Sequence, residues 1–203
     1  MGRVSSVIFD VGNVLIRWDP KNLYRRIGYA DADSVAILAE TGLHEMNLEC
    51  DRGRPFAEAM AELAERHPRH REFIEAFDTR WTDMLDGAIE SNVSVLRDLK
   101  AVGTPVYAIT NFARSKFDVA CEIFPFLNTF DDIVVSADVG VLKPDPAIFR
   151  LLLERRQLDP SAAVFVDDSA KNVAAAAALG MHAIHATEGV SLREELRAVG
   201  FAI

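Results

Sequence analysis

Cysteine and long apolar runs are both scarce in this sequence of 203 residues. The longest nearly unbroken apolar stretch, residues 173–181, is far shorter than the ~20 residues of a membrane-spanning helix. The only two cysteines, Cys50 and Cys121, are too few for a disulfide framework or a four-sulfur zinc site. The N-terminus lacks the apolar region of a signal peptide. We therefore expect a soluble, cytoplasmic protein with no membrane partner.

Positive charge is also in deficit. The chain has 22 Lys and Arg against 31 Asp and Glu, which gives a net charge of −9 and a pI near 5.0. A protein that coats DNA or RNA shows the opposite excess, so we expect no nucleic-acid partner. A few cations and backbone N–H groups can still converge on a phosphate. Half of the residues are apolar, which is typical of a folded chain with a substantial core.

Short apolar runs alternate with amphipathic stretches along most of the chain. The runs predict strands at residues 4–9, 106–110, 133–136, 163–166 and 181–185. The amphipathic stretches predict helices at residues 89–102, 113–121, 146–156 and 169–179. Alternating strands and helices indicate an α/β fold with a doubly wound, Rossmann-like parallel sheet. Such sheets bind ligands at the carboxyl ends of their strands.

One segment after the first strand interrupts this alternation. It contains no convincing strand, and its patterns predict helices at residues 34–41, 56–66 and 69–81. We therefore divide the chain into a core of residues 1–16 and 87–203 and a small α-helical cap of residues 17–86. The cap is expected to lie over the carboxyl edge of the sheet, with a hinge at each of its two ends.

Polar residues gather at or just beyond the ends of the predicted strands. Asp10 follows the first strand, Thr110 ends the second, Lys143 follows the third, and Asp167 and Asp168 follow the fourth. Each has an ordinary explanation: a turn cap, a strand threonine, a solvated loop lysine, or a helix N-cap. Together, three acids, a lysine and a hydroxyl at one sheet edge need a divalent metal or an anionic ligand to balance their charges.

This order of residues resembles the haloacid dehalogenase-like hydrolase superfamily, and the resemblance covers essentially the whole chain. The helical insert is similar to the family's small cap. Three stretches, residues 9–14 (FDVGNV), 49–54 (ECDRGR) and 141–149 (VLKPDPAIF), are most similar to the bacterial branch that includes glucose-1-phosphate phosphatases. The motifs are specific as a group, whereas none is specific alone.

The resemblance implies a Mg²⁺-dependent phosphatase that hydrolyses a small phosphorylated metabolite, such as a sugar phosphate, and that acts as a monomer. Asp10 is then the nucleophile that forms an aspartyl-phosphate. Thr110, the Asn111 N–H and Lys143 bind the phosphate, and Lys143 also offsets the carboxylates. The residues implied at the metal are Asp10, the Gly12 carbonyl and Asp168, with Asp167 beside them and Asn172 in support.

The sequence departs from the family's phosphatases at one position. They carry a second aspartate two residues after the nucleophile as general acid and base, and Gly12 stands there in this chain. Without that acid we expect faster hydrolysis of sugar 1-phosphates than of 6-phosphates, and a steep dependence on leaving-group pKa. A cap residue, Asp19 or His44, is the alternative acid. Trp18, His44 and Arg52 are candidates for substrate contacts from the cap.

Two other functions stay open. The family's dehalogenases also lack the second aspartate and use their nucleophile on carbon without a metal. The adjacent acids Asp167 and Asp168 disfavour that alternative, because they would repel a metal-free carboxylate nucleophile. The second alternative is a phosphate-binding or regulatory protein that has lost turnover, and Gly12 is its only support.

Overall fold

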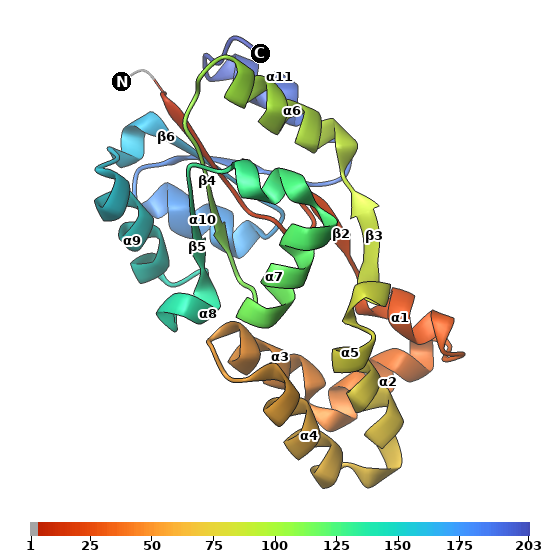
Figure 1. Ribbon diagram of the computed structural model, residues 1–203. Helices are drawn as coiled ribbons and strands as arrows, with labels where there is room; N and C mark the ends of the chain where they lie inside the picture. The colour runs from red at the N-terminus through yellow and green to blue at the C-terminus, as the bar shows by residue number, and fades with distance from the viewer. Residues whose placement is uncertain (1–3) are drawn as a thin grey trace.

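The structure is a computed structural model that describes residues 4–203, so the first three residues of the expected core segment lie outside it. Figure 1 shows an elongated molecule, with a sheet and its flanking helices at one end and a group of helices at the other. The described N-terminal strand begins, and the chain ends, at the sheet end of the molecule. Within the described range, no helix is long and apolar enough to cross a membrane.

The central sheet has five parallel strands in the order β5-β4-β1-β6-β7. This order confirms the predicted doubly wound parallel sheet. The first strand lies in the middle, the next two extend to one side and the last two to the other. The carboxyl edge on both sides of β1 is therefore the switch point where such sheets open a crevice. The strands are β1 (Ser6–Phe9), β4 (Val106–Thr110), β5 (Asp132–Val135), β6 (Ala163–Asp167) and β7 (His182–His185).

Helices cover both faces of the sheet, which explains why the three central strands, β1, β4 and β6, are buried along their whole length and are mostly apolar. Side chains alternate along β1: Val7 and Phe9 pack in the cluster under α6 and α11, whereas Ile8 packs in the cluster under α9 and α10. A further helix, α7, lies between the sheet and the helices at the other end of the molecule (Figure 1). The helices of this part are α6 (Glu90–Ala101), α7 (Arg114–Ile123), α8 (Ser136–Val139), α9 (Pro146–Arg156), α10 (Ala170–Ala178) and α11 (Leu192–Ala198).

The inserted segment folds into helices, as its patterns predict. The helix predicted at residues 56–66 is present with those bounds, but two helices before it have weaker patterns and are not among those predicted. The helices of the inserted segment pack their apolar faces around Tyr24 and Phe73, whose rings stack with centroids 3.6 Å apart. This cluster continues into Phe112 and Phe117 of the sheet part. The helices are α1 (Pro20–Arg26), α2 (Asp31–Thr41), α3 (Leu43–Asp51), α4 (Phe56–Arg66) and α5 (Arg71–Thr79).

A two-stranded antiparallel ribbon connects the helical segment to the sheet part, and the sequence analysis did not foresee it. β2 (Ile16–Trp18) leads into the segment and β3 (Leu85–Ala88) leads out of it, with Ile16 paired to Ala88 and Trp18 to Leu85. Both strands are too short for a clear alternating pattern, and each finds its partner far away in the sequence. The two crossings are therefore held together by backbone hydrogen bonds.

Candidate active site

Three polar residues meet at the carboxyl edge of the sheet because their strands are neighbours. Asp10 directly follows β1, Thr110 is the last residue of β4, and Asp167 is the last residue of β6. The Asp10 N–H donates to the Val166 carbonyl at 2.8 Å, which extends the β1–β6 pairing up to the carboxylate. The topology thus brings together the residues that the sequence analysis placed at strand ends.

Asp10, Asp167 and Asp168 form a compact carboxylate cluster. Each offers one oxygen, and these oxygens all lie within 4.8 Å of one another. Asp10 and Asp167 are buried, and Asp168 is partly exposed. Burial and the negative charge of Asp167 raise the pKa of Asp168, against the opposing charge of Lys143. Carboxylates this close need a cation to be ionised together.

Lys143 supplies part of that positive charge. Its Nζ lies 2.8 Å from Asp10 Oδ1 and 2.7 Å from Asp167 Oδ2, and its side chain is only 1% exposed. Burial alone would lower the pKa of Lys143, but the two carboxylates outweigh burial and raise it. Burial raises the pKa of Asp10 to about 6 although Lys143 opposes this effect. The ionised form of each group therefore depends on the others.

Two asparagines hold this arrangement in place. The Asn111 side chain accepts from the Lys143 N–H at 2.8 Å and donates to the Lys143 carbonyl at 3.0 Å, which fixes the backbone of the lysine. Asn172 Nδ2 donates to both oxygens of Asp167 at 3.0 and 3.1 Å. The Ser169 N–H also donates to Asp167 Oδ1 at 2.8 Å. Both oxygens of Asp167 therefore already have protein partners.

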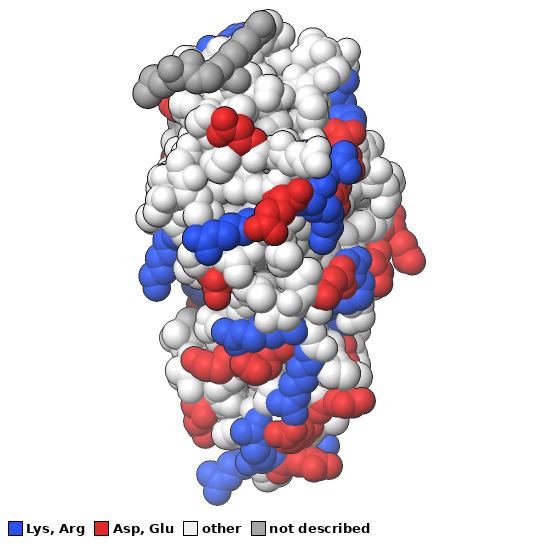
Figure 2. Space-filling model, turned by 90° about the vertical axis from the view of Figure 1, so that its left-hand side faces the viewer, with Lys and Arg blue, Asp and Glu red and all other residues white. Residues whose placement is uncertain are grey.

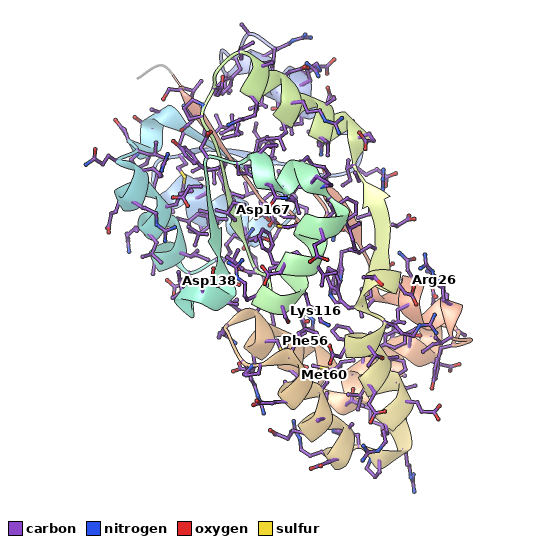
Figure 3. The ribbon with its side chains drawn as sticks, viewed as in Figure 1. Arg26, Phe56, Met60, Lys116, Asp138 and Asp167 are labelled. Atoms are coloured by element: carbon purple, nitrogen blue, oxygen red, sulfur yellow. The ribbon has the colours of Figure 1, made fainter. Side chains whose placement is uncertain are left out.

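A cavity of about 350 Å³ opens above the cluster, between the sheet part and the helical segment. Asp167 lies beneath it and is fully buried (Figure 3). Two of the three expected contact residues from the helical segment, Trp18 and His44, line the cavity. The other predicted site residues that line it are Asp10, Gly12, Thr110, Asn111, Lys143, Asp168 and Asn172.

Two of the sequence candidates lie away from the cavity. The Asp19 carboxylate accepts from the Lys21 N–H at 2.9 Å and caps the start of α1. Arg52 is half exposed and pairs with Glu49 at 2.7 Å. Asp19 is therefore not placed to act as the acid, and Arg52 is not placed to contact a substrate in this cavity.

The sequence analysis missed several residues that line the cavity. Lys116 extends from α7 to Asp78 of α5, with Nζ 2.5 Å from the carboxylate, and lies over the Phe56 ring at 4.6 Å (Figure 3). Asp51 is buried at the end of α3 and belongs to the quoted stretch 49–54, which was the only signal that pointed to it. The remaining unpredicted residues at the cavity are Asn47, Trp81, Phe112 and Ala113.

The donor set at the cavity fits a hard divalent cation. Mg²⁺ prefers carboxylate and carbonyl oxygens together with water in octahedral geometry. Asp10, Gly12 and Asp168 line the cavity and offer such oxygens beside the solvent-accessible space. One lysine cannot neutralise three clustered carboxylates, so a further cation lowers the electrostatic cost of the site.

The fold and this sheet edge define a hydrolase class. The chain belongs to the haloacid dehalogenase-like hydrolases, whose family pattern it matches over residues 4–180. This match confirms the resemblance found in the sequence. The protein is therefore an enzyme of the hydrolase type.

Known proteins with similar sequences include phosphatases. A sesquiterpene phosphatase of Aspergillus oryzae, astK, is 31% identical over 205 residues that cover 95% of this chain and 94% of that protein. A D-ribitol-5-phosphate phosphatase of Bacteroides thetaiotaomicron is 25% identical, with coverages of 97% and 98%. The fold matches a crystal structure of a family enzyme from the same bacterium in complex with magnesium and inorganic phosphate. That match has a TM-score of 0.75 and 22% identity and covers 96% of this chain and 100% of the other.

Proposed function

We propose that this hydrolase cleaves phosphate monoesters in a Mg²⁺-dependent reaction, with Asp10 as the nucleophile. The observation that carries the proposal is the pairing of the buried Lys143 with Asp10 beside a carboxylate cluster that fits a divalent cation. Two full-length relatives named as phosphatases support it. So does the bound magnesium and phosphate in the Bacteroides thetaiotaomicron enzyme of the same fold.

Each residue at the cavity has a role in this proposal. A carboxylate oxygen of Asp10 attacks phosphorus and forms an aspartyl-phosphate, which water then hydrolyses. The hydroxyl of Thr110, the N–H of Asn111 and Lys143 bind phosphate oxygens. Asp10, the Gly12 carbonyl and Asp168 would hold Mg²⁺, which supplies positive charge to the transferring phosphoryl group when bound. Asp167 does not line the cavity, so we assign it a supporting role: it accepts hydrogen bonds from Lys143 and Asn172 and holds both in place.

We propose residues 1–16 and 87–203 as the core and residues 17–86 as a cap that closes over the substrate. Closure excludes water from the site of phosphoryl transfer. The β2–β3 ribbon is the connection about which the cap moves. One chain supplies both walls of the cavity, which supports a monomer as the active form. Sedimentation of the purified protein tests the monomer.

The walls of the cavity favour a substrate with an apolar face. Trp18, Phe56, Trp81 and Phe112 line it together with the polar cluster. Aromatic rings pack against an apolar alkyl or isoprenoid group, and also against the apolar face of a sugar ring. One phosphatase relative is named for a sesquiterpene, which is an isoprenoid, and the other for the phosphate of ribitol, an acyclic sugar alcohol. A panel of sugar phosphates and isoprenyl and aryl phosphates therefore identifies the ester group.

Turnover of p-nitrophenyl phosphate tests the proposed function. We expect hydrolysis with Mg²⁺ and none in EDTA, and we expect Asp168→Ala to weaken Mg²⁺ binding and activity together. Chloride release from a 2-haloacid in EDTA would assign the dehalogenase reaction instead. Binding of inorganic phosphate without turnover of any phosphate ester would assign the non-catalytic alternative.

A further inference from the structure

The site lacks a side chain at the position where the family's phosphatases carry their acid. A Cβ added to Gly12 would meet no heavy atom within 4 Å, so the space beside the nucleophile is open. Gly12 lines the cavity. Cleavage of the ester is slow when the leaving alcohol departs as an unprotonated alkoxide. A general acid that protonates the leaving oxygen typically raises the rate by about 10²–10⁴-fold. The proton therefore has to come from another wall of the cavity.

Asp51 is the acid that the cap places against the sheet part. Its backbone carbonyl accepts from Ser136 Oγ at 2.6 Å, and the same Ser136 oxygen accepts from the Phe112 N–H at 2.9 Å. Phe112 lies two residues beyond Thr110, in the loop that follows β4. The Asp51 backbone is thus fixed to the loop that we propose binds the phosphate.

Asp51 lines the same cavity as Asp10. The residue is buried, and its Oδ2 accepts from Asn47 Nδ2 at 3.2 Å. His44 lines the cavity from the same face of α3, but it lies seven residues earlier, about 10 Å up the helix axis. Asp51 is at the end of α3 that touches the core, so of the two it is the one held at the phosphate loop.

We propose that Asp51 is the general acid and base of this enzyme and replaces the side chain absent at Gly12. This inference rests on the proposed phosphatase function. It assigns the proton transfer to the cap, so the catalytic set is complete only when the cap is seated on the core.

The proton balance follows from this assignment. As Asp10 attacks, the phosphorus–oxygen bond to the leaving group breaks, and the protonated Asp51 gives its proton to the leaving oxygen. The products are an alcohol, the aspartyl-phosphate (an acyl phosphate) at Asp10 and an Asp51 carboxylate. That carboxylate then removes a proton from water as the water oxygen bonds to phosphorus. The bond from phosphorus to Asp10 breaks, which releases phosphate and restores both carboxyls.

The protonation of Asp51 supports this role. Burial raises the pKa of the Asp51 carboxyl from 3.8 to about 7, against the opposing effects of the Ala113 N–H and the charge of Arg52. Lys116 lines the same cavity, but its Nζ is paired with Asp78. A substantial fraction of Asp51 is therefore protonated near neutral pH, as a general acid requires.

Leaving-group dependence tests the assignment. We would measure kcat/KM with Mg²⁺ for a series from p-nitrophenyl phosphate to phenyl and alkyl phosphates. The wild type should show a shallow dependence on leaving-group pKa, in place of the steep dependence that the sequence analysis expects of an enzyme without an acid. Asp51→Asn should lose about 10²–10⁴-fold on alkyl phosphates and far less on p-nitrophenyl phosphate, whose leaving group needs no proton. Slow hydrolysis of the phosphoenzyme should also give this variant a burst of nitrophenol.

Matched variants separate proton transfer from docking. Ser136→Ala removes the hydrogen bond to the Asp51 carbonyl and keeps the Asp51 carboxyl. It should therefore lower kcat/KM by the same factor for every substrate of the series. Asp19→Asn removes a carboxylate outside the cavity and should match the wild type. Asp51→Glu retains an acid and should restore a shallow dependence.

Several outcomes would overturn the assignment. A steep dependence in the wild type does so without any variant, and so does an equal loss across the series in a folded Asp51→Asn. A steep dependence in His44→Gln alone would move the role to His44. If the wild type hydrolyses no phosphate ester, the proposed function itself fails.

Discussion

At the scale of single residues, the site depends on one buried lysine between two buried acids. Lys143 contacts Asp10 at 2.8 Å and Asp167 at 2.7 Å, and the side chains of Lys143 and Asp167 are at most 1% exposed. Removing one partner of such a group leaves an uncompensated buried charge. The three residues that we propose for the nucleophile and its support are therefore also expected to contribute to stability.

We expect Asp10→Asn to abolish hydrolysis and to preserve the fold. The amide is nearly isosteric but cannot act as an anionic nucleophile, so activity should fall by about 10⁴-fold or more. Phosphatase assays with thermal unfolding check this prediction. Full activity, in protein shown by mass spectrometry to be free of deamidation, would remove Asp10 from its role.

We expect Lys143→Met to lower the free energy of unfolding by about 3–5 kcal/mol in metal-free buffer, because two buried carboxylates lose their cation. Added Mg²⁺ should recover part of this loss. Lys100→Met is the matched control, since its 2.7 Å pair with Asp131 is one-third exposed and should matter by less than about 1 kcal/mol. Urea unfolding of the three proteins measures the difference. Equal losses in the two variants would contradict the buried-charge argument.

Asp51 gives stability a dependence on pH. Burial holds its pKa at about 7 in the folded protein, well above the 3.8 of an exposed aspartate. As pH rises from about 4 to 7, the unfolded chain releases this proton first, so the free energy of unfolding falls. Asp51→Asn removes this loss. It should gain on the order of 3 kcal/mol relative to the wild type between pH 4 and pH 8. A difference that does not change with pH would refute this prediction.

At the scale of elements, the junction between α3 and α8 has no room for a side chain. A Cβ on Gly53 would lie 2.7 Å from the Ala137 carbonyl oxygen, and the φ of Gly53 is +108°. Gly53 follows the end of α3, two residues after Asp51. Close backbone contact here seats the end of α3, which carries Asp51, against α8 of the sheet part.

Gly53→Ala should therefore impair both stability and substrate use. Gly28→Ala is the control, because Gly28 also has a positive φ, +94°, but a Cβ there meets nothing within 4 Å. The control should lose about 1–2 kcal/mol from backbone strain alone. Gly53→Ala should lose more and should also raise KM. Denaturant unfolding and steady-state kinetics test this pair of variants. Equal stabilities and equal KM values in the two variants would show that the backbone at the α3–α8 junction adjusts to a side chain.

At the scale of the whole molecule, the chain carries a net charge of −9. The face that Figure 2 shows nevertheless carries both acidic and basic side chains. Acidic and basic side chains alternate over the lower part of that view. The concentrated negative charge that matters for a ligand is instead the carboxylate cluster at the sheet edge. This arrangement favours a bound cation at the site over a charged partner on that face.

Metal binding should therefore stabilise the whole protein. Mg²⁺ binds the folded state and not the unfolded chain, so a concentration of 100 times Kd should add about 2.7 kcal/mol. Asp168→Ala should shift this response to higher Mg²⁺, and EDTA should abolish both the stabilisation and the activity of the wild type. Thermal unfolding across a Mg²⁺ titration measures it. A melting temperature that does not respond to Mg²⁺ would argue against the metal site.

The sequence by itself determined the sheet and most of the polar set at its edge. The five strands are apolar enough to be recognised locally, and polar site residues lie at or beyond the ends of four of them, as Asp10 and Asp168 do. Parallel topology then brings strand ends together without further information. These features depend on short-range patterns, which a single sequence displays directly.

Which residues face one another across the cavity depends on contacts between distant parts of the chain. Asp51 and Asp19 are both acids of the inserted segment, and no local pattern tells that one is buried and held by Ser136 while the other caps a helix. The β2–β3 pairing and the position of Asp167 beneath Lys143 likewise depend on partners far away in the chain. Such contacts arise from how helices and strands pack, and packing is a property of the folded molecule rather than of any segment.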